Sequence, residues 1–452
     1  MKKQNVKRFF AFLLIASGCF SYAQTDNNSE EVKKEKLVLT VDDAVKYALE
    51  NNKTLKSSAI DLEIKKRANM YSWNVFMPTL GVSGTASRTT DIDQYVQNYG
   101  YPDEEKTHWS VLGNAGFSWA FNAAMLAQIK LAKINYEAGK ISYEKSCTEM
   151  ETNIRKMFYS ILLAQENLKI NKDSLANAKA RYDQAAINYR NGLVPELSLL
   201  NTQVTYENQK PAVLKAEKSL DQVLDSFAFL LGLPFGTQIE LSGKITVKPV
   251  KVDSEELVKR YIESSNEINS LKKNIESAYF GLKAKRLSVY TPSIALNYNY
   301  QPMFYAMGEK KTGSDIKDNG SLSITLAFTD VLGWLPFSSA SQSIKDIQRQ
   351  INQLELAYEM TVDGARVEIH KLVDNLEISK QNLATMEANV ELAQKAYNST
   401  LRAFYNGTQE WLSVKESDSQ LQQARLGLMN ERFNYISAVL DLEQKLNMKI
   451  SE

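Results

Sequence analysis

The sequence predicts a mainly α-helical chain with a small β part, in which a helix-strand-strand-helix repeat is used twice. Three observations predict this fold class: long stretches without proline that carry a heptad repeat, four short stretches of alternating hydrophobicity, and internal similarity at a nearly constant offset. We expect residues 1–24 to be a signal peptide, residues 25–250 the first repeat and residues 251–452 the second.

The first 24 residues are typical of a secretory signal peptide. Four cations precede an apolar run from Phe9 to Phe20, and the small residues Ser21 and Ala23 follow it like a cleavage site. The letters ASGC at 16–19 also resemble a lipobox, in which Cys19 would be lipidated. Cleavage after Ala23 fits about as well or better, and Cys19 is then an ordinary residue of a discarded signal.

Composition argues against several classes of function. The signal carries four of the 54 Lys and Arg residues and no acid, so the mature chain has 50 cations against 53 acids and gives no reason to expect nucleic acid. After cleavage at Ala23 only Cys147 remains, which excludes an intrachain disulfide, and with only His108 and His370 beside it we expect no metal site. No nucleotide, protease or hydrolase motif is present, so we expect no enzyme and no cofactor.

Hydropathy excludes one kind of membrane protein. No apolar run of 18 residues follows the signal, and the mean hydropathy is −0.35, which argues against a helical membrane protein. The alternating strands of a β-barrel leave little trace in averaged hydropathy and stay possible.

The two halves of the chain match residue by residue. Adding 215 to a first-half number reaches the equivalent residue around two Asn-Gly sequences: Tyr182 matches Tyr397, Gly192 matches Gly407, and Leu197 matches Leu412. Near the start of each half the offset is 213 or 214, as for Pro78 and Pro292. An offset this steady indicates duplication.

Each repeat is expected to hold one long antiparallel helical hairpin. Residues 103–194 and 337–452 lack proline, and a heptad runs through each half in two series: Ile161, Leu168, Leu175, Tyr182, Tyr189 and Leu376, Leu383, Val390, Tyr397, Phe404. We expect hairpins over about 123–232, with its tip at 191–195, and about 338–446, with its tip at 406–409. On the heptads alone, a cytoskeletal or tethering coiled coil fits equally well.

Four predicted strands between the helices argue against a cytoskeletal or tethering coiled coil. Segments of about 79–90, 108–121, 293–302 and 320–329 alternate an uncharged apolar face with small or polar residues, which is typical of outer-membrane strands. The long polar stretches 90–107 and 303–319 are expected to be extracellular loops. A soluble sandwich is the alternative, but it would not feed each strand pair into a heptad helix.

Four strands cannot close a barrel, because open edges in hydrocarbon leave backbone groups unpaired. The chain must therefore complete its barrel with copies of itself. Two copies would give eight strands with a filled interior, and three would give twelve strands with a pore. Small lumen-facing residues favour the pore.

The chain resembles the TolC-like outer-membrane efflux proteins over essentially its whole mature length. The most specific segments are residues 39–84 (LTVDDAVKYALENNKTLKSSAIDLEIKKRANMYSWNVFMPTLGVSG), residues 216–234 (AEKSLDQVLDSFAFLLGLP) and the doubled turn. The resemblance implies a homotrimer in the outer membrane, with a barrel of four strands per chain continuous with a long α-helical coiled-coil barrel in the periplasm. It also implies a passive exit duct of a tripartite efflux or type I secretion system, docked to a periplasmic adaptor and an inner-membrane transporter of the RND or ABC type.

The resemblance further implies that adaptors dock at the two turns. The family often has Tyr-x-Val-Gly-[Leu/Thr] there, whereas this chain has Asn191 and Asn406 in place of valine. The Asn suits a helix end with a left-handed residue. The expected docking residues are Gly192, Leu193, Val194, Gly407, Thr408 and Gln409. Alternatively, Leu193 and Val194 tuck under the helix ends.

The same turns would also narrow the channel. Some family members carry acids six and nine positions after the second glycine, where this chain has Ser413 and Glu416. We therefore expect a weaker acidic gate, although Glu416 fits a solvated helix face equally well. The expected constriction residues are Tyr189, Ser198, Asn201, Phe404, Ser413 and Glu416.

One other class of function fits the hairpins. A periplasmic coiled-coil adaptor or structural tether without a pore would share them. Such a protein has no use for uncharged faces on four strands, and the channel is accordingly the favoured interpretation.

Overall fold

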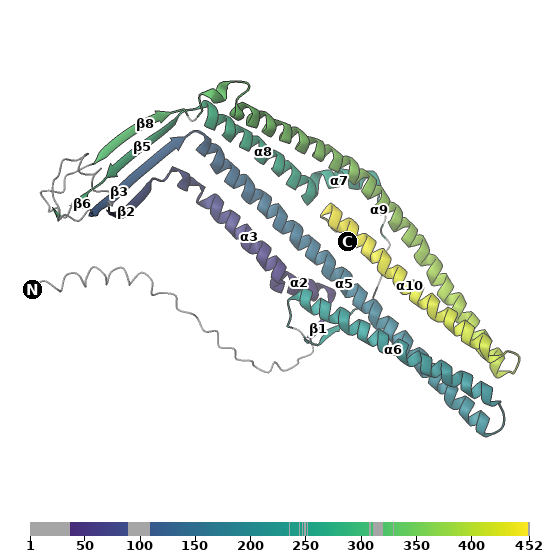
Figure 1. Cartoon of the computed structure of the whole chain (residues 1–452). Helices are drawn as coiled ribbons and strands as arrows, with labels where there is room; N and C mark the ends of the chain where they lie inside the picture. The colour runs from purple at the N-terminus through teal and green to yellow at the C-terminus, as the bar shows by residue number, and fades with distance from the viewer. Residues whose placement is uncertain are drawn as a thin grey trace, which may run out of the picture.

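The computed structural model describes residues 37–88 and 109–450, apart from residues 235, 244, 246, 248, 249, 251, 307, 308, 311–319 and 329. The expected signal peptide, Cys19 and the polar stretch 90–107 lie outside the described residues. The described chain is a long, bent rod with a sheet at one end and two helical hairpins at the other (Figure 1). The expected mainly helical fold with a small sheet part is confirmed.

Two long hairpins form the rod. Helix α5 (Ala124–Arg190) returns as α6 (Glu196–Leu231), and α9 (Ser339–Tyr405) returns as α10 (Trp411–Leu446). Helices α5 and α9 both have 67 residues, and α6 and α10 both have 36. At 1.5 Å per residue the longer helices span about 100 Å. Their a/d positions bury Ile161, Ala178 and Ala185 on α5 and Val414, Leu421 and Leu428 on α10.

Four shorter helices continue or brace the hairpins. They are α2 (Val41–Asn51), α3 (Lys53–Met70), α7 (Ser254–Ser264) and α8 (Asn266–Tyr290). Helix α2 starts with a capping box between Thr40 and Asp43, which the segment TVDD encodes locally. Among the described residues, no helix is long and apolar enough to cross a membrane.

The shorter helices α3 and α8 each begin where a return helix ends. The Asn52 side chain caps α3 and donates to the Leu230 carbonyl of α6 at 2.6 Å. The Ser264 hydroxyl, next to the N-cap of α8, donates to the Leu446 carbonyl of α10 at 3.0 Å. Orphan groups at helix ends are thus satisfied across the junctions, and each pair behaves as one interrupted helix.

Most of the core lies at these junctions. Strand β1 (Leu37–Leu39) pairs in parallel with β4 (Ile239–Leu241), and both pack with α2, α5 and α6 around the fully buried Phe158, Phe227 and Leu231. A second cluster around Tyr261 and Ile369 joins α7, α8, α9 and α10. The middle of the rod is consequently the best-buried part of the chain.

The sheet contains the four expected strands in the order β2-β3-β5-β8, all antiparallel. They are β2 (Thr79–Arg88), β3 (Trp109–Asn122), β5 (Ser293–Tyr300) and β8 (Ser321–Ala327). Their register places Leu80 opposite Phe117, Phe117 opposite Tyr298, and Tyr298 opposite Leu322. Opposite residues of neighbouring strands point to the same face, so the apolar positions of all four strands share one face.

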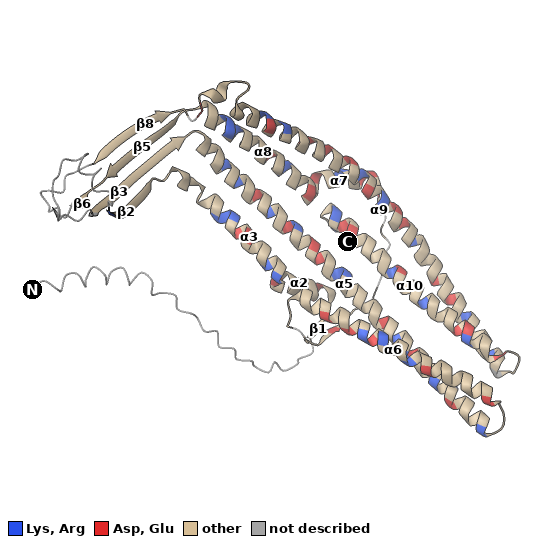
Figure 2. Cartoon of the chain, viewed as in Figure 1, with Lys and Arg blue, Asp and Glu red and all other residues tan. Residues whose placement is uncertain are grey.

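The other face carries small and polar residues. Thr79 lies opposite Ser118, Ser118 opposite Asn297, and Asn297 opposite Ser323. The Ser118 hydroxyl donates to the Asn297 side chain at 2.7 Å. Figure 2 shows almost no charge along these four strands, whereas the helices carry both signs throughout.

One expectation was wrong in detail. The stretch 303–319 was expected to be a loop, but it begins with β6 (Met303–Ala306), which pairs with β3 and with β7 (Glu309–Lys310). Strand β5 pairs only with residues 115–122 of β3, so the start of β3 needs another partner. The chain bends at Pro302, whose carbonyl accepts from the Gly113 N–H at 2.8 Å, and then resumes pairing as β6.

Candidate channel wall and docking tips

Within the described residues, the chain is a layer four elements wide from the sheet to the hairpin tips, with two edges that no other described element covers. Among the described strands, the sheet ends at β2 on one side, and at β8 and (beyond β6) at β7 on the other. Below it, α3 packs on α5, α5 on α8 and α8 on α9; nearer the tips, α6 packs on α5, α5 on α10 and α10 on α9. One edge is therefore β2, α3 and α6, and the other is β8 and α9 (Figure 1).

The helices of both edges expose large apolar side chains. Nine of them are each 57–74% exposed: Ile60 and Ile64 on α3, Val204 and Leu214 on α6, and Leu356, Met360, Val367, Ile378 and Leu392 on α9. At 100° per residue the five on α9 fall within about 40° of one another. We call these nine residues the edge stripes. Exposed apolar surfaces of this kind mark sites that pack against protein or membrane.

The two hairpin tips use the same backbone geometry. Gly192 has φ 71° and Gly407 has φ 73°, the left-handed region that favours glycine. The Leu193 N–H donates to the Asn188 carbonyl at 2.8 Å and the Gly192 N–H to the Tyr189 carbonyl at 2.9 Å. Thr408 and Gly407 repeat both bonds to Ala403 and Phe404. Each α5 and α9 end is a Schellman motif in which Asn precedes the left-handed glycine.

The tips differ in side-chain chemistry. Leu193 is 71% exposed and Val194 is half-buried, so Leu193 does not tuck under the helix end. Thr408 and Gln409 are exposed, and the Thr408 hydroxyl donates to the Ala403 carbonyl. Pro195 takes the N-cap position of α6. The first tip is apolar and the second polar.

The expected constriction residues do not form one cluster within a single chain. Tyr189 is exposed at the end of α5, while Phe404 of α9 is half-buried and lies edge-on to Trp411, with ring centroids 5.4 Å apart. Ser198 and Ser413 are half-buried in the first turns of the return helices. Asn201 and Glu416, one turn further along, are exposed.

Sequence reasoning missed the contact that ties the two hairpins together near their tips. The guanidinium carbon of Arg181 on α5 lies 4.3 Å from the centre of the Trp411 ring, and its Nη1 is 3.7 Å from Asp418 Oδ2 on α10. Gln422 donates to Asp418 at 3.2 Å and to Ser174 of α5 at 2.7 Å. Arg181 flanks the heptad position Tyr182, and a charge beside a heptad seam is the signal that could have indicated it.

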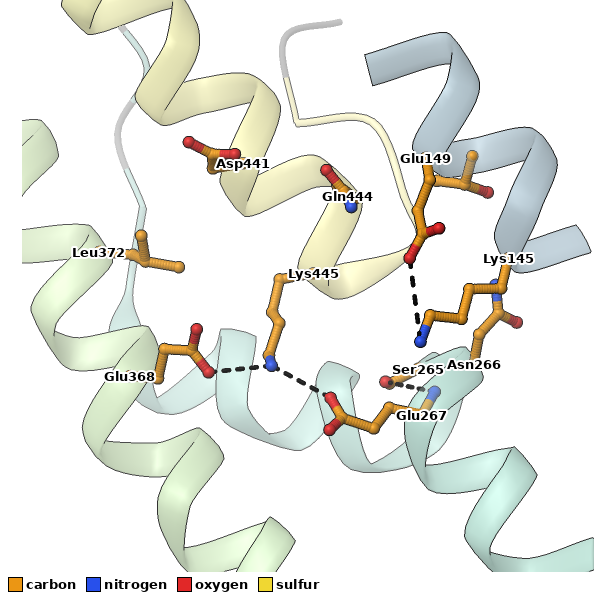
Figure 3. A pocket seen from close by; sticks show the side chains of 11 residues that line it. Lys145, Glu149, Ser265, Asn266, Glu267, Glu368, Leu372, Asp441, Gln444 and Lys445 are labelled. Atoms are coloured by element: carbon orange, nitrogen blue, oxygen red, sulfur yellow. Dashed lines mark hydrogen bonds and ion pairs between the residues drawn. The ribbon is translucent and has the colours of Figure 1, made fainter. Parts of the chain in front are cut away.

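A polar cavity of about 470 Å³ lies at the junction of α10 with α8 (Figure 3). Lys445 of α10 reaches across it to Glu368 of α9 at 2.9 Å and to Glu267 of α8 at 3.1 Å. Burial alone would lower the pKa of Lys445, but its hydrogen bonds to the two carboxylates outweigh burial and raise it. The same junction holds the pKa of Glu267 below its usual value: burial raises it, and hydrogen bonds from Tyr261 and Lys445 lower it by more.

The chain is similar to known outer membrane proteins. Residues 44–233 match the family described as outer membrane efflux protein. The chain is 22% identical over 296 residues to the outer membrane protein TolC of Vibrio cholerae serotype O1, and that match covers 65% of this chain and 66% of the relative's length.

Solved structures have the same fold. The CmeC outer membrane channel of Campylobacter jejuni superposes with a TM-score of 0.73 at 15% identity, over 91% of this chain and 87% of that one. The open state of the MtrE outer membrane channel of Neisseria gonorrhoeae gives 0.70 at 14% identity, over 91% of this chain and 89% of that one.

Proposed function

We propose that this chain, identified as a member of the TolC-like outer membrane efflux proteins, closes into a homotrimer. The chain lies in the outer membrane with a periplasmic helical tunnel. The homotrimer would serve as the passive exit duct of a tripartite efflux or type I secretion system. It would take its cargo from a periplasmic adaptor and an inner-membrane transporter of the RND or ABC type.

The observation that carries this proposal is the four-element layer with two open edges. The sheet, the helices next to it and the helices near the tips all end at the same two edges. One rotation that brings β8 and α9 of one copy against β2, α3 and α6 of the next copy would therefore close the sheet and both helical layers together. Heterologous contacts of this type generate rings. Three copies would give twelve strands and twelve helices around one axis, which is wide enough for a pore.

The two faces of the sheet suit a pore in lipid. The apolar face includes Leu80, Val82 and Ile324, which are 79%, 88% and 75% exposed in the single chain. Facing outward, they would meet hydrocarbon, and the Ser, Thr and Asn face would line water. A coiled-coil tether would leave this face without a partner.

The tips are the proposed docking sites. An exposed Leu193 beside a glycine with open space around it offers a small apolar knob at the end of each first hairpin. We propose that Gly192, Leu193, Val194, Gly407, Thr408 and Gln409 meet adaptor residues. Tyr189, Ser198, Asn201, Phe404, Ser413 and Glu416 would then lie around the narrow end of the channel.

The closure is tested by one charge placed on or off an edge stripe. Ile378→Lys puts a cation in the α9 stripe, whereas Glu377→Lys changes charge one residue away, about 100° round the helix. We expect outer-membrane extracts of the first variant to lose the heat-modifiable oligomer and its conductance in planar bilayers. The second should keep both. Equal oligomer yields from the two variants would contradict closure through α9.

A further inference from the structure

A short apolar segment outside the strands remains unexplained by the channel. Between β8 and α9 the chain forms the one-turn 3₁₀ helix η2 (Leu332–Trp334). Within residues 331–337 five large apolar side chains are exposed: Val331 by 60%, Leu332 by 70%, Trp334 by 52%, Leu335 by 39% and Phe337 by 79%. Connecting segments in water normally present polar residues, so this composition calls for an apolar environment.

The segment is continuous with the apolar face of the sheet. Phe328, one residue after the end of β8, continues the apolar alternation of Leu322, Ile324 and Leu326. Its ring meets that of Trp334 edge-on, with centroids 5.7 Å apart. The contact between Phe328 and Trp334 therefore joins the apolar side chains at the end of β8 to those of residues 331–337.

The other half of the chain places a similar turn at the same level. The 3₁₀ helix η1 (Ser72–Phe76) precedes β2, and its Phe76 ring stacks on Phe121 of the apolar face at 6.1 Å. Tyr71, Trp73 and Met77 around it are 50%, 49% and 52% exposed. Both 3₁₀ helices thus lie between a strand and a helix, η1 between α3 and β2 and η2 between β8 and α9.

Residues 331–337 carry no charged side chain, and hydrogen bonds hold their backbone in place. Asp330 accepts from the Gly333 N–H at 2.8 Å, and the Trp334 indole donates to the Val289 carbonyl of α8 at 3.3 Å. On the α9 side, Lys345 donates to the Pro336 carbonyl at 3.4 Å. The apolar side chains therefore project from a fixed frame, with a cation at its helical side.

We propose that residues 331–337 lie in the polar–apolar boundary of the periplasmic leaflet of the outer membrane, as an anchor that fixes how deeply the barrel sits. The inference rests on the proposed membrane insertion of the sheet. Aromatic and leucine side chains on one side and a lysine on the other suit the interface between acyl chains and phospholipid head groups. A soluble protein partner would need to cover a surface that is already continuous with the lipid-facing strands.

Spin labelling in phospholipid vesicles tests the proposal. In a Cys147→Ser background, a single cysteine would be placed at Phe337, at Val82 on the sheet or at Leu412 near a tip, and labelled with a nitroxide. All three positions are more than half exposed, and the unmodified background supplies the blank. Relaxation by oxygen reports acyl surroundings and relaxation by a nickel chelate reports water.

We expect the 337 label to favour oxygen over nickel several-fold more than the 412 label does, and to read shallower than the 82 label. A 337 label that matches 412, while 82 reads as lipid, would overturn the anchor and leave the channel intact. A 337 label shielded from both agents would place it against another copy and also overturn the anchor. If 82 itself reads as water, membrane insertion of the sheet is what fails.

Discussion

Arg181 of α5 lies over the ring of Trp411 of α10, with 4.3 Å between the guanidinium carbon and the ring centre, and its Nη1 is 3.7 Å from Oδ2 of Asp418, which is also on α10. The side chains of Arg181 and Asp418 are only 20% and 14% exposed. Trp411 also touches Phe404 of α9, so one arginine joins the two hairpins just above their tips. Interactions of this kind are stronger when partly desolvated.

Removing that arginine should loosen the tips relative to each other. We expect Arg181→Ala to raise hydrogen exchange at both tips and to increase single-channel conductance, because α5 is freed from α10. The loss of stability should be about 1–2 kcal/mol. Lys172→Ala is the matched control, since Lys172 pairs with Glu217 inside the first hairpin at 2.9 Å. If both variants conduct alike, the Arg181 contact does not restrain the aperture.

Two substitutions at Gly192, the glycine of the first tip, distinguish an effect on docking from an effect of backbone strain. A Cβ added at Gly192 meets open space, but the residue must keep φ 71°, at a cost of about 1–2 kcal/mol. Gly192→Ala and Gly192→Trp share that strain and differ only in bulk. We expect both to reach the outer membrane, and only the tryptophan variant to lose adaptor pull-down and efflux. An equal loss in both variants would assign the effect to strain rather than to docking.

The single acid near the second tip gives a prediction about ion flow. If three copies of Glu416 surround the axis, they attract cations and narrow the channel. We expect Glu416→Ala to raise conductance in a planar bilayer and to reduce cation selectivity. Asp225→Ala, at the far end of α6, should change neither. Unchanged conductance and selectivity in the Glu416 variant would leave this carboxylate as a solvated surface residue.

The sequence could predict the features that depend on local pattern. Alternation in β2, β3, β5 and β8 predicted one apolar face, and the heptads led to α5, α6, α9 and α10 with their tips. It could not predict that the chain leaves β5 and resumes pairing with β3 as β6 after Pro302, because that depends on the start of β3, which β5 does not reach. The Arg181, Trp411 and Asp418 contact was missed for the same reason. Arg181 lies more than 200 residues before Trp411 and Asp418, and the heptad seam beside Arg181 does not indicate which residues of the other hairpin it contacts.

The α10–α8 junction should respond to acid through Lys445 and Glu267. The pKa of Glu267 is lowered in the folded chain, so its stabilising effect is present above the usual value of 4.5 and is lost as pH falls below it. Because Glu267 is 46% exposed and solvent screens the pair, the effect should be about 1 kcal/mol or less. Burial and the hydrogen bond to Glu267 raise the pKa of Tyr261 to about 12. The contribution of Tyr261 to stability is therefore present below pH 10 and is lost as the pH rises from 10 to about 12. The junction should therefore be tightest between these limits.

Hydrogen exchange of the α8 amides near Glu267 measures this directly. We expect Lys445→Met to speed exchange there at pH 7 and to flatten its dependence on pH between 6 and 4, since Glu267 then loses the cation that lowers its pKa. Lys395→Met removes an exposed i,i+4 pair with Glu391 on α9 and should leave the junction unchanged. If the Lys445 variant keeps the full pH dependence, Tyr261 rather than Lys445 controls the charge of Glu267, because the tyrosine hydroxyl bonds the same carboxylate at 2.9 Å.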